Sequence, residues 1–147
     1  MTAYEVKHKM RQAYKLRKEI RAKQEAMQEL RSVAEKVTAS FSPAPAGGSN
    51  GSSRIENYAI RIVEMQGDLA EASDHLLDML QEVMALIELA EDPIQRAALT
   101  QYHINGCTAE EAADRIGYSQ TQFWRIVDNA YIDISKRWNE MEWNETH

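Results

Sequence analysis

The amino-acid sequence predicts an all-α protein: a long antiparallel helical hairpin (a coiled coil) followed by a C-terminal helix-turn-helix. Three observations lead to this prediction. The 147 residues include only 6 glycines and 3 prolines, and residues 40–53 hold most of them. Apolar residues repeat every seven positions on both sides of that segment. After Pro93 the pattern changes to shorter amphipathic stretches separated by turn and capping residues.

Residues 1–39 predict the first, basic helix of the hairpin. They contain neither glycine nor proline and consist mostly of strong helix formers. One heptad position is apolar throughout: Val6, Ala13, Ile20, Met27 and Ala34. A second series contains Leu16, Leu30 and Val37 but is interrupted by Lys9 and Lys23. Residues 1–40 hold ten Lys and Arg against five Asp and Glu.

Residues 40–53 predict a flexible linker in which the hairpin turns, because two prolines and three glycines disfavour a continuous helix. Residues 54–92 predict an acidic heptad helix, since residues 41–92 hold two basic against ten acidic residues. Its two apolar series are Ile55, Ile62, Leu69, Leu76, Val83 and Ala90, and Tyr58, Met65, Ala72, Met79 and Leu86. Antiparallel pairing with the basic helix is the first interpretation. A four-helix homo-oligomer is the alternative.

Residues 93–138 predict the helix-turn-helix. Pro93 suits the first turn of a helix that ends near Gly106, a residue able to adopt a left-handed conformation. Thr108 and Glu111 form a capping-box pattern for a short helix that Gly117 ends, and Ser119 and Gln122 form a second one. The last helix has an apolar face of Phe123, Ile126, Val127, Ala130, Tyr131 and Ile134. A compact three-helix core without DNA binding would show the same spacing.

Residues 108–126, TAEEAADRIGYSQTQFWRI, resemble the fourth region of sigma-70 family factors, in which Thr-x-x-Glu-Ile-Ala-x-x-Leu-Gly-x-Ser precedes the DNA-recognition helix. The matching residues are Thr108, Glu111, Ala113, Gly117 and Ser119. The complete arrangement, a basic helix, a Ser/Gly linker, an acidic heptad helix and this module, resembles small phage and prophage late-transcription regulators of the ArpU/RinA type.

The resemblance implies that Gln120, Thr121, Trp124 and Arg125 face a DNA groove, with Phe123 and Ile126 in the core. Gln122, Asp128 and Asn129 are further candidates. Arg pairs well with guanine and Gln with adenine, which agrees with this implication. Trp124 departs from the family, which usually has a polar or basic residue there, and packing is the first interpretation for it.

The charge of the module departs from that of most DNA-binding domains, since residues 93–147 hold five basic and eight acidic residues. A single copy is therefore expected to bind DNA weakly. The basic first helix could add phosphate contacts, although pairing with the acidic helix is the simpler use of its charge.

The sequence gives little support for a metal site, a cofactor site or a catalytic site. The lone cysteine, Cys107, is interpreted as a structural residue. The four histidines are widely spaced and are expected at the surface, and the acidic pair Glu110 and Glu111 is expected to stabilise a helix start. We therefore expect no metal, no cofactor and no enzymatic activity. Local packing is expected for Trp138 and, in the acidic tail of residues 139–147, for Met141 and Trp143. No segment has the length and apolarity of a membrane span, so a cytoplasmic protein without membrane contact is expected.

The sequence thus predicts a sequence-specific transcriptional regulator of phage type that binds double-stranded DNA and acts with RNA polymerase or as a homo-oligomer. Two alternatives remain open. One is a small terminase-like DNA-packaging subunit, which also joins a helix-turn-helix to oligomerising helices. The other is a protein-interaction module that has kept the fold without DNA binding, as the acidic balance allows.

Overall fold

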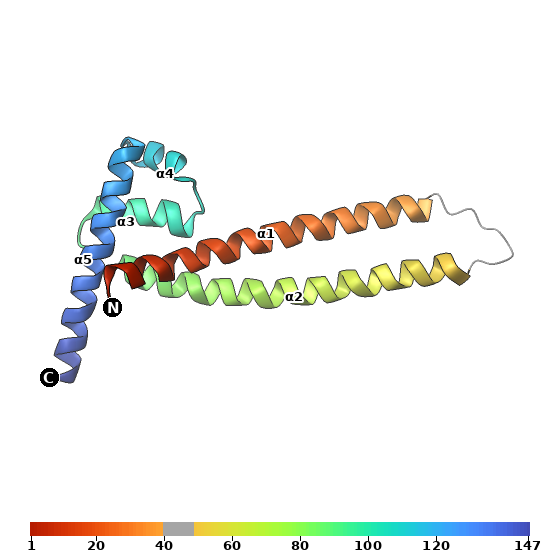
Figure 1. Ribbon diagram of the computed structural model, residues 1–147, viewed down its shortest axis with the longest axis horizontal. Coiled ribbons are helices and arrows are strands. Elements are labelled where there is room, and N and C mark those ends of the chain that lie inside the picture. Colours follow the sequence, from red (N-terminus) through yellow and green to blue (C-terminus); the bar gives the residue numbers. More distant parts are fainter. Residues whose placement is uncertain (40–48) are drawn as a thin grey trace. The chain divides into compact units, whose positions relative to one another are not determined.

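The computed structural model describes residues 1–39 and 49–147, and this part of the chain is helical without any strand, as predicted (Figure 1). Two long helices, α1 (Ala3–Ala39) and α2 (Ser49–Ile87), precede α3 (Pro93–Leu99) and the π-helical turn η1 (Thr100–Ile104). The chain ends with α4 (Ala109–Ile116) and α5 (Gln120–Thr146). In these described ranges no helix is both long and apolar enough to cross a membrane.

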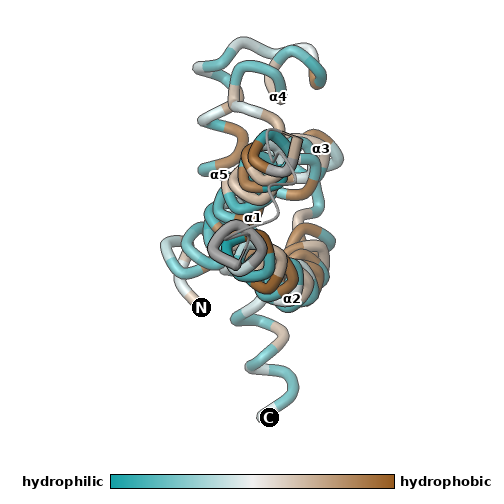
Figure 2. Tube along the Cα trace, turned by 90° about the vertical axis from the view of Figure 1, so that its right-hand side faces the viewer, coloured by the Kyte–Doolittle hydropathy of each residue, from teal (hydrophilic) through white to brown (hydrophobic). Residues whose placement is uncertain are grey.

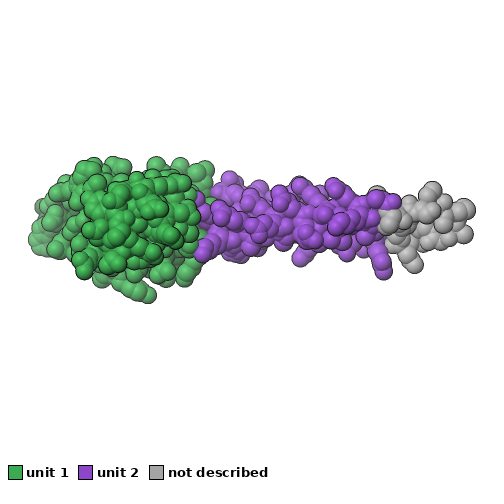
Figure 3. All heavy atoms as spheres, turned by 90° about the horizontal axis from the view of Figure 1, so that it is seen from above, with its two compact units in different colours: residues 1–16, 76–147 green, residues 17–75 purple. Residues whose placement is uncertain are grey.

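The helices form two compact units, which we call unit 1 (residues 1–16 and 76–147) and unit 2 (residues 17–75), coloured green and purple in Figure 3. In unit 2, the segments of α1 and α2 run antiparallel and lie side by side in both views (Figures 1 and 2). Most predicted heptad positions are turned inward there: Ile20 and Leu69 are buried, and Met27, Leu30, Ile62 and Met65 are half-buried, whereas Tyr58 is exposed. Apolar packing between two helices therefore accounts for this unit.

Unit 1 has a larger core, in which the first turns of α1 and the last turns of α2 pack with α3, η1, α4 and α5. Val6, Ala13 and Val83 are buried at their predicted heptad positions. Met10 is also completely buried, although it belongs to neither predicted series. Because more than one partner covers α1 in this unit, a wider face of the helix than a two-helix seam is turned inward.

The predicted boundaries of α2 are wrong at both ends. The helix begins at Ser49, inside the segment 40–53 that the sequence assigns to a linker, because small polar residues and a single Gly51 weaken a helix without forbidding it. The rest of that predicted linker, residues 40–48, lies outside the described residues. At the other end α2 stops at Ile87, and Ala90 is buried in the core after a short turn.

The start of α3 follows the prediction. Asp92 has an extended backbone, as residues before proline prefer, and its side chain accepts a hydrogen bond from the Ile94 amide at 2.8 Å. Pro93 then occupies the first helical turn. The helix continues through η1, where the Asn105 amide donates to the Thr100 carbonyl at 2.9 Å. Gly106 follows with φ 72°, the left-handed conformation that the sequence predicts.

The prediction of a separate tail at 139–147 is wrong, because α5 continues to Thr146. This segment contains no glycine or proline, so no residue stops the helix. Of the three large side chains expected to pack locally, only Trp138 packs against the core of unit 1. Met141 is exposed, and Trp143 is 65% exposed with its ring against His147.

Candidate functional site

The connection between α4 and α5 is a tight turn of defined geometry. At the start of α4, the Thr108 hydroxyl accepts a hydrogen bond from the Glu111 amide at 3.2 Å, one of the two bonds of the predicted capping box. At its end, Gly117 has φ 78°, and the amides of Gly117 and Tyr118 donate to the carbonyls of Asp114 and Ala113. This is the Schellman pattern of helix termination, which needs a residue that tolerates a left-handed backbone.

The start of α5 is fixed by a complete capping box, as predicted. The Gln122 amide donates to the Ser119 hydroxyl at 3.2 Å, and the Ser119 amide donates to Gln122 Oε1 at 3.0 Å. The helix direction is therefore set immediately after the turn. The Gln122 side-chain oxygen is engaged in this cap, which leaves its NH2 group as the part that could contact a ligand.

The two faces of α5 differ sharply. One face is buried against α3, η1 and α4 and consists of Phe123, Val127, Ala130, Tyr131 and Ile134, all on the predicted apolar face. Ile126 is half-buried beside it. The opposite face exposes the predicted site residues Thr121, Arg125 and Asn129, together with Asp128, and Gln120 is exposed as the first residue of the helix, on the side of Phe123. The first two turns of α5 thus carry a row of polar side chains on a rigidly held helix.

Trp124 packs against other aromatic rings, which is the first interpretation from the sequence, and it stays partly exposed. Its ring meets Phe123 and Tyr102 edge-on, with centroid distances of 5.4 and 5.7 Å. Tyr102 in turn stacks on Tyr14 of α1 at 5.6 Å. Trp124 is nevertheless 39% exposed. It is held by aromatic neighbours while part of its ring remains available to a partner.

His103 contradicts the expectation that the histidines lie at the surface. It is 1% exposed, and its Nε2 lies 2.7 Å from the Tyr131 hydroxyl, which connects η1 to α5. Burial, with a smaller contribution from the positive charge of Arg11, lowers the pKa of His103 from 6.5 to about 4. Burial also raises the pKa of Tyr131 above its usual range. Both groups are therefore neutral at pH 7. His103 follows the buried Leu99 by four residues, and this helical spacing is the signal that the sequence interpretation overlooked.

Comparison with known proteins gave no match: no family model, no curated protein and no solved structure is significantly similar to this chain.

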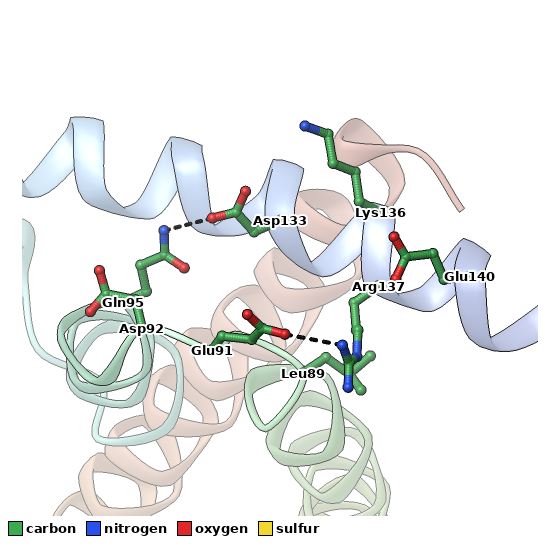
Figure 4. Close-up of a pocket in the computed structure, with 8 residues that line it drawn as sticks. All are labelled: Leu89, Glu91, Asp92, Gln95, Asp133, Lys136, Arg137 and Glu140. Atoms are coloured by element: carbon green, nitrogen blue, oxygen red, sulfur yellow. Dashed lines mark hydrogen bonds and ion pairs between the residues drawn. The ribbon is translucent and has the colours of Figure 1, made fainter.

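A second polar region of unit 1 surrounds a hollow of about 400 Å³ between the α2–α3 connection and α5 (Figure 4). Arg137 pairs with Glu91 at 3.0 Å across it, and Gln95 donates to Asp133 at 2.9 Å. Leu89, Asp92, Lys136 and Glu140 complete its lining. The described ranges contain no group of three or more His, Cys, Asp or Glu side chains placed to hold a metal ion. The contacts drawn in Figure 4 tie the connection, through Glu91, and α3, through Gln95, to α5.

The charges of unit 1 are unevenly distributed along the chain. Residues 76–147 hold five basic and thirteen acidic residues, whereas residues 1–16 hold four basic residues and one acidic residue. The exposed face of α5 contains Arg125 but also Asp128. The net positive charge of unit 1 is therefore confined to the segment that α1 contributes.

Proposed function

We propose that this chain is a sequence-specific DNA-binding regulator of transcription, of the phage type that its sequence resembles, in which α4, the turn at Gly117 and α5 form a helix-turn-helix. The observation that carries the proposal is the exposed polar row at the start of α5, with Thr121 and Arg125 opposite the buried apolar face and Gln120 at the exposed first position of the helix. In a helix-turn-helix the N-terminal residues of the second helix enter the major groove.

The chemistry of this row suits the edges of base pairs. The Arg125 guanidinium can donate two hydrogen bonds to guanine, and the Gln120 amide can pair with adenine. Thr121 can contact a base edge or a thymine methyl group, and Asn129, one turn after Arg125, can reach a base or a phosphate. Trp124 adds apolar surface at the edge of the row.

The residues that carry the sigma-like resemblance support the proposal through their structural roles. Thr108 and Ser119 cap the two helices, Ala113 is buried, and Gly117 has the left-handed backbone of the turn. These positions set the angle between the helices. The neighbouring polar positions on the exposed face of α5 are the ones at which target sequences would be distinguished.

We further propose that the hairpin supplies a second attachment, either to RNA polymerase or to another copy of the chain. The proposed recognition module is net acidic, so one copy gains little from phosphate attraction. A second point of attachment raises the effective concentration of the module at its site without adding contacts to bases. The same acidic balance favours the competing function, a protein-interaction module without DNA binding.

The test is a selection of DNA fragments by the full chain from a random library and from fragmented phage DNA at low salt. The proposal expects enrichment of a common sequence motif by the parent protein. An Arg125→Ala, Gln120→Ala double variant should lose the enrichment, and a Lys36→Gln variant, changed in unit 2, should retain it. Failure of the parent to retain any DNA would favour the interaction module.

A further inference from the structure

The first turns of α1 carry a basic stripe, which we define as Lys7, Arg11 and Lys15. Their spacing of four residues places them on one side of the helix. Arg11 and Lys15 are exposed and Lys7 is half-buried. Within residues 1–39 and 49–147 none of the three forms an ion pair with an acidic side chain.

In unit 1, the expected ion pairing between the basic and acidic helices is formed by a residue outside the basic stripe. Lys9 lies on the side of α1 that faces α2 and pairs with Glu82 at 3.1 Å. Lys9 is offset from Lys7 and Arg11 by two residues, about 200° around the helix. The basic stripe therefore lies on a different side of α1 from the ion pair with α2.

Contacts at both ends hold this segment of α1 against the candidate DNA-binding module. At the chain start, the Met1 amino group donates to Asn139 Oδ1 at 2.7 Å, and the Ser135 hydroxyl donates to the Met1 carbonyl at 2.6 Å. About three helical turns into α1, Tyr14 stacks on Tyr102, which meets Trp124.

The middle of the segment faces the same module. The positive charge of Arg11 reaches the buried pair on η1 and α5, where it adds to the lowering of the pKa of His103. The basic stripe thus lies on the segment of α1 whose Tyr14 ring packs on Tyr102 next to Trp124, and all of these residues belong to unit 1.

We propose that Lys7, Arg11 and Lys15 bind phosphates of the DNA backbone next to the groove that α5 enters. This inference rests on the proposed function and adds to it the source of affinity that an acidic module lacks. Lys7 and Lys15 are separated by about 12 Å along the helix axis, at 1.5 Å per residue. Phosphates of one DNA strand follow each other at about 3.4 Å along the duplex axis, so the stripe spans several of them. Such contacts strengthen binding to any sequence and fix orientation without reading bases.

The test compares the parent chain with a K7Q/R11Q/K15Q variant and with a matched R21Q/R31Q/K36Q variant. The second variant loses the same charge from exposed positions of the same helix, but in unit 2. Each protein is titrated with the selected duplex and with a scrambled duplex at salt concentrations from 50 to 200 mM (roughly the range over which phosphate contacts are resolved). Circular dichroism checks that the variants remain folded.

The basic stripe predicts that K7Q/R11Q/K15Q lowers the slope of log K against log salt by about 2 to 3, since each phosphate contact contributes about 0.9. Affinity at the lowest salt should fall at least about tenfold on both duplexes, with their ratio unchanged, and R21Q/R31Q/K36Q should behave as the parent. An unchanged slope in K7Q/R11Q/K15Q, or an equal loss in the matched variant, would overturn the inference while leaving the proposed function intact. A parent chain that binds neither duplex would overturn both.

Discussion

The imidazole of His103 and the hydroxyl of Tyr131 lie 2.7 Å apart in the core of unit 1 and join η1 to α5. Both side chains are buried. The pair therefore fixes the helix that carries the candidate site to the element that precedes α4. Because a buried polar group is costly without its partner, the pair is sensitive to mutation and to pH.

The pH dependence has a defined sign. The pKa of His103 falls from 6.5 to about 4 on folding, so between these values the unfolded chain binds more protons than the folded one. The contribution of neutral His103 to the free energy of unfolding is complete above pH 6.5. It decreases as the pH falls toward 4, by up to about 3 kcal/mol. Urea denaturation at a series of pH values measures this slope. A His103→Gln variant should lose most of the slope in this range, and an equal slope in both proteins would show that other groups cause it.

Removal of the hydroxyl tests the pair directly. Tyr131→Phe leaves the imidazole buried without its partner and should lower the free energy of unfolding by about 1 to 3 kcal/mol at pH 7. Tyr118→Phe is the matched control, because Tyr118 is 38% exposed and its substitution should change stability little. Equal effects of the two substitutions would contradict the role assigned to the pair.

Substitution by alanine should change stability in opposite directions at two glycines. Gly67 lies in the interior of α2, and a Cβ atom built there meets nothing within 4 Å, so Gly67→Ala should stabilise the protein by about 0.5 to 1 kcal/mol. A Cβ at Gly117 also has space, but its φ of 78° is left-handed, so Gly117→Ala should destabilise by about 1 to 2 kcal/mol. Denaturant unfolding of the two variants measures both. Destabilisation by Gly67→Ala would indicate that another molecule packs closely against this face of α2.

Unit 2 can be removed without changing the core of unit 1, because the buried residues of that core all belong to residues 1–16 and 76–147. A chain in which a short Gly/Ser turn replaces residues 17–75 should fold cooperatively. It should bind an isolated site nearly as well as the parent but bind paired sites, or the site with RNA polymerase present, distinctly more weakly. Equal affinity of both proteins under all of these conditions would remove the hairpin from recognition.

Several local features could be predicted from the sequence because they depend on few neighbouring residues. The cap at Ser119, the left-handed Gly117, the helix start at Pro93 and the buried face of α5 all follow from propensity and spacing. The exposed positions of Thr121 and Arg125 follow from the same periodicity, and Gln120 is exposed because it is the first residue of α5. These features define the candidate site.

Features that depend on several elements at once could not be predicted. The burial of Met10 requires a second partner for α1 besides α2, and a heptad pattern describes one partner only. The burial of His103 requires Tyr131, which lies 28 residues away. The π-helical geometry of η1 has no signature in composition. The extension of α5 to Thr146 shows that acidic and aromatic residues alone do not mark the end of a helix.

The central claim is that the exposed row on α5 reads DNA. The most direct measurement is a titration of the selected duplex and a scrambled duplex with the parent, Gln120→Ala, Arg125→Ala and Phe123→Ala proteins. The first two substitutions should each weaken binding to the selected duplex by about 1 to 3 kcal/mol, change binding to the scrambled duplex far less, and leave stability unchanged. Phe123→Ala should instead lower stability by about 3 to 5 kcal/mol. If Gln120→Ala and Arg125→Ala both bind the selected duplex as tightly as the parent, α5 does not lie in the groove and the account is wrong.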